Sequence, residues 1–395
     1  MKITVGVFFG GRSVEHEISI ITANQGINAI SASDKYQLVP IYVTKKGLWY
    51  TGEALFELSN YKDMDKLLMQ CEEVYMRPEY GDFNLYYKKT SVFKRTAIAH
   101  SLDVVFPAFH GTNGEDGCFQ GLLETIGIPY VGCNTLSSGV GMDKIFMKLI
   151  LKDNQIPVVD CCWFTDYRFK NEEEAVIAEV EAKMPYPVIV KPANLGSSIG
   201  ISKAANRAEL VASVEEAMQF SSRILVEEMV NNLREINCSV LGDCDNCEPS
   251  LCEEPFRSGA ILSYKDKYMG GSKSKGIANT VRTLPADLPE DLTTKIRQLA
   301  KQTFQVLSCN GVSRIDFMIN SETNAVYVNE INTIPGALSF YLWEATGVPF
   351  DQLMERLIEL AFKRDRQLKR KVASYDQNIF NLSGGGKMGK MGSKS

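Results

Sequence analysis

The segment SRIDFMINSETNAVYVNEIN, residues 313–332, contains two strongly apolar runs that charged side chains interrupt. The apolar runs predict β-strands at 313–319 and 325–331, separated by a short polar turn. Side chains two residues apart on a strand project from the same face. Pairing of the two strands would therefore bring four polar side chains onto one patch: Arg314 and Asp316 from the first strand, and Glu330 and Asn332 from the second.

A patch of this composition suits a divalent cation, since Mg²⁺ is usually held by one or two carboxylates together with phosphate oxygens. A surface ladder of ion pairs is the alternative. The flanking residues, which include Phe317 and Val328, are apolar. Charges are rarely placed on a buried sheet without a purpose. The pattern therefore favours a metal and phosphate site with Asp316, Glu330 and Asn332 as candidate ligands.

A second group of residues, upstream of this segment, is suited to phosphate. A strand expected at 186–191 ends in Lys191, and the loop GSSIG follows at 196–200. A lysine supplies a point charge, and a glycine–serine loop offers backbone N–H groups and hydroxyls to phosphate oxygens. The loop is not a Walker A sequence, so the pattern alone does not define the site. Lys144, in a helix expected at 142–151, is either a third candidate cation or a solvated helix residue.

The first part of the chain alternates strands with helices. Gly10 and Gly11 make a turn after the first strand, and Ser13 is the expected N-cap of the helix that follows. This alternation predicts a doubly wound, parallel sheet. The expected elements are strands at 3–9, 37–43 and 102–109, and a helix within 114–126.

Glycine turns at the carboxyl ends of parallel strands are where doubly wound sheets bind their ligands. The turn after the first strand lacks the Gly-x-Gly-x-x-Gly pattern, which disfavours a dinucleotide. Glu15 is suited to meet an ammonium group, whereas His16 is interpreted as structural. His110 begins a glycine-rich segment, and for this residue a catalytic and a structural role are both open.

Changes in composition and in the pattern of expected strands and helices along the chain predict three domains and a tail. The parallel sheet is expected in 1–134, a central subdomain in 135–225 and a C-terminal subdomain in 226–372. Within the last of these, residues 263–285 are rich in Gly, Ser and Lys and are expected to form a lid. Residues 373–395 are expected to be a flexible tail because Gly, Lys, Met and Ser dominate its end.

The composition excludes several classes of protein. The 395 residues are 45% hydrophobic and 23% charged, as in ordinary globular chains, and the net charge of −5 does not favour a nucleic-acid binder. No apolar run is long enough to span a membrane, and 3–9 is not followed by a signal-peptide cleavage site, so a cytoplasmic protein is expected.

The ten cysteines are scattered along the chain and are expected to be reduced thiols, mostly buried. Cys244 and Cys247 have zinc-type spacing, but no second pair matches them, so a loop with free thiols is favoured over a zinc site.

Taken together and in this order, these pieces resemble the D-alanine–D-alanine ligases of the ATP-grasp superfamily. The resemblance extends from residue 3 to about residue 360, and it implies an ATP-grasp fold preceded by the doubly wound domain. The matching motifs are FGGRS (9–13) with EHE (15–17), HGTNGEDG (110–117), IPYVG (128–132), MDK (142–144), VKP (190–192) with GSS (196–198), RID (314–316), and EINT (330–333) with PG (335–336).

The resemblance implies ATP and two Mg²⁺ ions, with Mn²⁺ as a substitute, and it assigns residues to them. Asp316, Glu330 and Asn332 are the implied metal ligands. The residues implied for ATP are Lys144, Lys191 and Lys267 with Ser197 and Ser198 for the phosphates, the hinge Glu227, Glu228, Met229 and Val230 for adenine, and Glu235 for the ribose.

For the amino-acid substrates, the resemblance implies that Glu15 holds the ammonium group of the first D-alanine, in a hydrogen-bonded chain with Ser197 and Tyr268. Arg314 and the backbone N–H of Gly336 would meet the tetrahedral oxyanion. The remaining implied substrate residues are His110, Tyr341 and Leu342. The lid, with Tyr264, Lys267 and Tyr268, would exclude water from an acyl-phosphate intermediate.

One position departs from the family pattern. Tyr341 stands where the ligases carry a serine that helps to bind the carboxylate of the second substrate, and Ser339 is two residues away. Three hypotheses follow: a D-alanine–D-alanine ligase for peptidoglycan, a related ligase with another second amino acid such as D-serine, and a non-catalytic nucleotide-binding regulator. The regulator is disfavoured because the phosphate lysines and metal ligands are all retained. The family also suggests a homodimer, with no nucleic acid and no membrane as partner.

Overall fold

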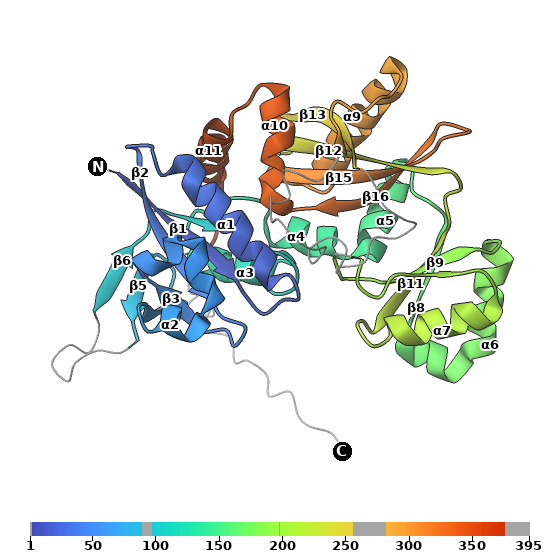
Figure 1. Ribbon diagram of the computed structural model, residues 1–395, viewed down its shortest axis with the longest axis horizontal. Coiled ribbons are helices and arrows are strands. Elements are labelled where there is room, and N and C mark those ends of the chain that lie inside the picture. The colour runs from blue at the N-terminus through green and yellow to red at the C-terminus, as the bar shows by residue number, and fades with distance from the viewer. Residues whose placement is uncertain (1, 89–96, 197, 256–281, 376–395) are drawn as a thin grey trace, which may run out of the picture.

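The computed structural model describes residues 2–88, 97–196, 198–255 and 282–375. They form three β-sheets with helices packed against them (Figure 1). The predicted Ser197, Tyr264, Lys267 and Tyr268, most of the lid (263–281) and most of the tail (376–395) lie outside the described residues.

The N-terminal sheet is parallel at its centre, where β1 (Ile3–Gly10) lies between β2 (Tyr36–Val43) and β7 (Val104–Pro107). The prediction of a parallel sheet is confirmed for these strands but is wrong for the rest of the sheet. Four short strands extend it with antiparallel pairing. They are β3 (Trp49–Thr51), β4 (Glu72–Met76), β5 (Asn84–Tyr87) and β6 (Ile98–Ser101), and η1 (Glu53–Phe56), η2 (Leu58–Lys62) and α2 (Met64–Leu68) lie between β3 and β4.

Two predicted helix starts need correction. Helix α1 (His16–Ile30) begins after Ser13, and the Ser13 hydroxyl accepts a hydrogen bond from the Glu15 N–H, so Ser13 forms the preceding turn and not the N-cap. The helix expected at 142–151 corresponds to α5 (Lys144–Asp153) and begins two residues later than predicted, after a separate helix, α4 (Thr135–Met142). The Asp143 carboxylate caps α5 by accepting from the N–H groups of Ile145 and Phe146 at 3.1 and 3.0 Å.

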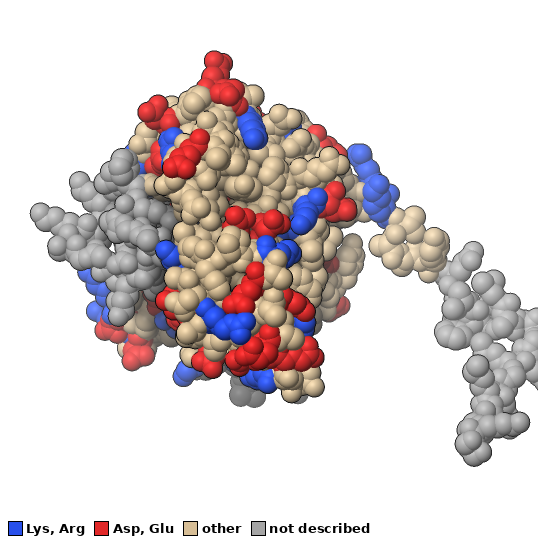
Figure 2. Space-filling model, turned by 90° about the vertical axis from the view of Figure 1, so that its right-hand side faces the viewer, with Lys and Arg blue, Asp and Glu red and all other residues tan. Residues whose placement is uncertain are grey.

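The second sheet has four antiparallel strands in the order β10-β9-β11-β8. Helices α6 and α7 share an apolar core with the sheet. Their outer surface carries ion pairs such as Arg207–Glu181, and the face in Figure 2 has intermingled acidic and basic side chains. The bounds are β8 (Cys161–Thr165), α6 (Asp166–Lys183), β9 (Val188–Pro192), β10 (Ser202–Ala204), α7 (Arg207–Ala217) and β11 (Arg223–Glu228).

The C-terminal sheet has the order β14-β13-β12-β15-β16, and all its pairs are antiparallel. Helix α9 (Glu290–Val306) buries Ile296, Ala300 and Phe304 against one face. The last residues of the predicted lid include a two-residue strand, β14. The remaining bounds are β12 (Leu233–Gly242), β13 (Cys247–Pro255), β14 (Arg282–Thr283), β15 (Gly311–Asn320), β16 (Ala325–Asn332), η4 (Gly336–Ser339), α10 (Phe340–Thr346) and α11 (Phe350–Leu368).

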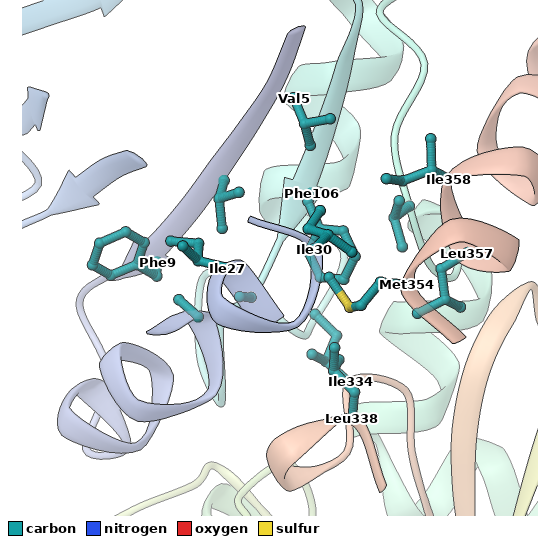
Figure 3. Packing of buried hydrophobic residues seen from close by; sticks show 14 of the residues in the cluster. Val5, Phe9, Ile27, Ile30, Phe106, Ile334, Leu338, Met354, Leu357 and Ile358 are labelled. Carbon is teal, nitrogen blue, oxygen red and sulfur yellow. The ribbon is translucent and has the colours of Figure 1, made fainter. Parts of the chain in front are cut away.

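One apolar core joins the two ends of the chain. Helix α11 packs beside α1 against the N-terminal sheet, so Leu357 and Ile358 share a cluster with Val5 and Phe106 (Figure 3). Leu338, from the segment after β16, enters the same cluster. This shared core fixes the N-terminal sheet relative to the strands that carry the polar patch.

The ten cysteines are all free, and five of them are buried. Cys247 and Cys252 are buried in β13, whereas Cys244 is exposed before it. Within the described residues, no helix combines the length and the apolar character needed to cross a membrane.

Candidate active site

The predicted polar patch lies on the paired strands β15 and β16. Arg314 lies opposite Asn332, and Asp316 lies opposite Glu330, as the alternation of side chains requires. The Arg314 guanidinium donates two hydrogen bonds to the Asp316 carboxylate, at 2.6 and 2.8 Å, and the Asn332 amide donates to the same carboxylate at 3.0 Å. The four residues therefore converge as the sequence predicted.

The electrostatics of this patch fit a divalent cation. Two carboxylates directly opposite each other on neighbouring strands repel. Burial raises the pKa of Asp316 against the opposing effect of Arg314, and the charge of Glu330 raises it further. A cation between the carboxylates would remove this repulsion. Among the described residues no group of three His, Cys, Asp or Glu side chains surrounds a metal position, so a cation would rely on two carboxylates, an amide and phosphate oxygens.

Lys144 lies against this patch. As the first residue of α5, it projects back toward the helix N-terminus, and its ammonium group donates to the Leu195 carbonyl at 2.7 Å and lies 3.4 Å from Glu330. The side chain is only 6% exposed, which excludes the solvated helix lysine that was the alternative reading. The loop after β9 and the polar patch on β15 and β16 therefore meet at Lys144.

Lys191 belongs to a buried ion-pair network with Glu227 and Lys148, and of these three residues Lys148 was not predicted from the sequence. The Glu227 carboxylate, 1% exposed, lies 2.6 Å from the Lys191 ammonium and 3.0 Å from that of Lys148. Burial alone would raise the pKa of Glu227, but Lys148 and Lys191 outweigh it and hold this pKa at about 2. Lys191 also donates to the Asn329 side chain at 3.1 Å. The signal for Lys148 was its position one helical turn after Lys144, on the same face of α5.

The other residues assigned to ATP follow β11 or lie near it. Glu228 is exposed at the end of the strand, and Met229 and Val230 are half-buried just beyond it. Glu235 is half-buried on β12, and Ser198 follows β9 in the left-handed region with φ of 58°. Their contacts with adenine, ribose and phosphate stay predictions.

Glu15 lies immediately before α1, 9% exposed, and its carboxylate is bordered by two glycine loops. A Cβ atom on Gly111 would lie 2.7 Å from its Oε2 atom, and one on Gly196 would lie 3.0 Å from it. Glycine at both positions therefore lets the 110–117 loop and the loop after β9 approach the carboxylate. The expected first-substrate residue thus lies where two motifs meet.

Glu115 was not singled out from the sequence, although it lies in the HGTNGEDG motif. Its carboxylate accepts hydrogen bonds from the N–H groups of Gly111 and Ile334, at 3.1 and 3.2 Å. Burial raises the pKa of Glu115 to about 8, and the neighbouring charge of Glu15 contributes to the increase. Glu115 therefore connects the loop after β7 to the segment after β16.

His110 supports the same region. Its Nε2 atom lies 2.7 Å from the Thr22 hydroxyl, and that hydroxyl accepts from the Ala337 N–H at 3.3 Å. Burial lowers the pKa of His110 to about 4, so the imidazole is neutral at pH 7. These contacts favour a structural role, and its predicted contact with substrate stays a prediction.

The segment after β16 has an unusual backbone. After Gly336, the residues Ala337, Leu338 and Ser339 have φ angles of 51°, 53° and 51°. This left-handed turn inserts Leu338 into the core and leads directly into α10. The turn therefore sets the position of Gly336 on one side and of Tyr341 on the other.

Tyr341 is fixed by residues that the sequence reasoning did not name. Its hydroxyl donates to the Glu253 carboxylate at 2.7 Å, and the Arg282 guanidinium lies 3.8 Å from the centre of its ring. Leu342, also assigned to the substrate, has a fully buried side chain. No sequence pattern linked Glu253 to Tyr341, because they are 88 residues apart.

Comparison with known proteins agrees with this geometry. The family models described as D-ala D-ala ligase N-terminus and C-terminus match residues 4–133 and 150–359. The D-alanine–D-alanine ligase of Thermosipho melanesiensis is 42% identical over 383 residues, which are 97% of this chain and 99% of that protein.

Two solved structures are also similar. The D-alanine–D-alanine ligase from Coxiella burnetii has a TM-score of 0.75 and 32% identity, covering 93% of this chain and 96% of that one. The VanG D-Ala:D-Ser ligase from Enterococcus faecalis has a TM-score of 0.76 and 30% identity, covering 91% of this chain and all of that one. With both family models matched over nearly the whole length and the predicted patch assembled, the chain is a member of the D-alanine–D-alanine ligase family.

Proposed function

We propose that this enzyme joins two D-alanines into D-alanyl-D-alanine, with conversion of ATP to ADP and phosphate. The observation that carries the proposal is the assembly of Arg314, Asp316, Glu330 and Asn332 beside Lys144. Cations, metal ligands and an oxyanion donor on one patch are the requirements of phosphoryl transfer followed by acyl transfer.

The proposed reaction has two steps. In the first, a carboxylate oxygen of one D-alanine attacks the γ-phosphorus of ATP, which gives an acyl phosphate and releases ADP. In the second, the amine of the other D-alanine, having lost its extra proton, attacks the acyl carbon, and phosphate leaves. Glu15 holds the first ammonium group, Lys144 and Lys191 neutralise phosphate charge, and Arg314 with the Gly336 N–H meets the oxyanion.

Asp316, Glu330 and Asn332 would hold the magnesium. Mg²⁺, when bound, supplies positive charge against the phosphate oxygens. We propose two such ions, with Mn²⁺ as a substitute, because the resemblance implies them. The network of Lys148, Glu227 and Lys191 keeps a cation at a fixed position where the phosphates are expected.

The family resemblance also supports a cellular context. We propose that the product serves peptidoglycan synthesis in the cytoplasm, and that the enzyme is a homodimer with its domains divided near residues 134 and 225. Light scattering after gel filtration measures the mass directly, and a monomer at working concentrations would contradict the dimer.

A second candidate is a ligase that accepts another amino acid, such as D-serine, as the second substrate. Two observations favour it: Tyr341 donates its hydroxyl proton to Glu253, and a similar solved structure is a D-Ala:D-Ser ligase. A serine at this position would have a hydroxyl free to donate to a carboxylate, whereas this phenol does not.

The experiment that tests the proposal is phosphate release from ATP and Mg²⁺, scanned over D-amino acids singly and in pairs, with mass spectrometry of the products. D-alanine alone should give the D-alanyl dipeptide with one phosphate per peptide bond. Turnover only with a second amino acid supports the alternative. ATP binding without turnover on any pair contradicts both.

A further inference from the structure

A row of polar residues extends from the metal patch across the C-terminal sheet. In cross-strand register, Glu330 on β16 lies opposite Asp316 on β15, Asp316 lies opposite Asn237 on β12, and Asn237 lies opposite Glu253 on β13. Residues opposite one another share a face, and neighbouring strands are about 4.8 Å apart, so Glu253 lies roughly 10 Å from Asp316 on the face of the active site. Glu330, at the other end of the row, lies beside Lys144.

Glu253 is a buried carboxylate whose two oxygens are both bound. Its Oε1 atom accepts from the Asn237 amide at 3.0 Å and from the Tyr341 hydroxyl at 2.7 Å. Its Oε2 atom accepts from the Arg282 guanidinium at 3.1 Å. The residue is 2% exposed. Burial of a charged carboxylate costs free energy unless such hydrogen-bond and ion-pair partners stabilise the charge.

These contacts hold Tyr341 in one orientation. Arg282 covers one face of its ring, and Phe340 meets it edge to face with ring centres 6.1 Å apart. Burial and Glu253 both raise the pKa of Tyr341, and Arg314 opposes them, so the phenol stays protonated at neutral pH. The hydroxyl of Tyr341 donates its single proton to Glu253. The phenol oxygen can therefore only accept further hydrogen bonds, and the Arg282 cation lies beside the ring.

We propose that Glu253 is a positioning residue for the second amino acid, and that it acts by holding Tyr341 and Arg282 at the second-substrate subsite. This proposal rests on the proposed function, because the family resemblance behind that function assigns Tyr341 to the second amino acid. It gives a role to Glu253, which lies at the opposite end of the polar row from Glu330. The row then connects the proposed phosphate and metal site with the proposed site of the second amino acid. Glu253 itself touches neither substrate.

The test compares Glu253→Gln, Tyr341→Phe and the double variant with the wild-type enzyme. Glu254→Gln is the matched control, because Glu254 is the next residue on β13, projects from the opposite face and forms its own pair with Arg234 at 2.7 Å. Each protein is assayed at saturating ATP over a range of D-alanine or of the accepted pair, which resolves the KM of the first and second amino acids. A second series at saturating amino acid over a range of ATP gives the KM of ATP.

We expect Glu253→Gln to raise the KM of the second amino acid about tenfold or more, as loss of a charged hydrogen-bond partner would. The KM of ATP and of the first amino acid should stay within about twofold, as should every constant of Glu254→Gln. Tyr341→Phe should produce a similar increase, and the double variant should be no worse than the more impaired single variant, because the two residues act as a unit.

Three results would overturn the proposal: an unchanged second KM in Glu253→Gln, a parallel rise of all three KM values, or full additivity in the double variant. Tyr341→Phe keeps the ring and its packing but removes the hydroxyl that donates to Glu253. If Glu253→Gln does not fold, the second KM of Tyr341→Phe still tests the proposal. A wild-type enzyme that rejects D-alanine but accepts another pair contradicts the proposed function alone, and the same series run with that pair still decides the role of Glu253.

Discussion

At the scale of single residues, the proposed metal site depends on the paired carboxylates of Asp316 and Glu330. Glu330→Gln replaces a charged ligand by a neutral amide while keeping the size of the side chain. ATP turnover should fall by about a hundredfold or more, because charge on the transferring phosphoryl group is no longer neutralised. Phosphate release measures this loss, and the thermal midpoint should change little. Equal activity in Glu330→Gln and in Glu322→Gln, an exposed site in the β15–β16 turn, would contradict the metal assignment.

Glu115 should give stability a pH dependence of its own. Its folded pKa of about 8 lies above the 4.5 of an ordinary glutamate, so the folded state binds the proton more tightly than the unfolded state. This contribution is fully present below pH 4.5 and is lost as the pH rises through 8. Glu115→Gln should therefore flatten the decline of the free energy of unfolding between about pH 5 and pH 8. Urea titrations at several pH values measure the slope, and the exposed Glu216→Gln should leave it unchanged.

At the scale of elements, two of the three lysines on α5, Lys148 and Lys152, differ in their burial. Lys148→Met keeps the length of the side chain but removes one of two cations from the buried Glu227. We expect a loss of about 1–3 kcal/mol in the free energy of unfolding, moderated by the remaining Lys191, and a higher KM for ATP. Lys152→Met, one turn later with a 67% exposed side chain, should change stability by less than about 0.5 kcal/mol. Equal effects of the two substitutions would contradict the role given to Lys148.

The left-handed turn after β16 can be tested by comparing two substitutions of Ala337. Ala337 has a φ of 51°, so Ala337→Val places a β-branched side chain in a backbone conformation that such residues avoid. The cost should be about 1–3 kcal/mol in the free energy of unfolding, with a loss of kcat because Gly336 shifts. Ala337→Gly fits this φ without strain and should stay within about 1 kcal/mol of the wild type. Chemical denaturation distinguishes them, and a more stable valine variant would mean that the turn can rearrange.

The elements differ in how far the sequence predicted them. Long apolar strands such as β1, β15 and β16 were predicted within one or two residues, because burial on a sheet demands a run of apolar residues. Strands β3 to β6 were missed, because three to five residues carry too little pattern to distinguish an edge strand from a loop. Helix α4 was missed as well, and the helix expected at 142–151 began two residues before α5.

At the scale of the whole molecule, stability should depend on the core that joins the two ends of the chain. Leu357 on α11 is fully buried in that core. Leu357→Ala should lower the free energy of unfolding by about 2–5 kcal/mol through lost burial and a residual cavity. Leu368→Ala, near the end of the same helix and 59% exposed, should cost less than about 0.5 kcal/mol. A small effect of Leu357→Ala in urea titrations would mean that α11 is not needed to hold the N-terminal sheet.

The composition of the patch on β15 and β16 was predictable from the sequence. A period of two places Arg314 with Asp316 and Glu330 with Asn332 on one face, and this requires only local geometry. The partners of residues far apart in the chain, in contrast, follow only from the packing of the fold. Glu253 reaches Tyr341 through the register of three strands and a left-handed turn, and Glu227 lies between lysines of two different elements. Such contacts depend on how elements pack, because a buried charge must find its partner in space and the order of residues along the chain does not specify where that partner lies.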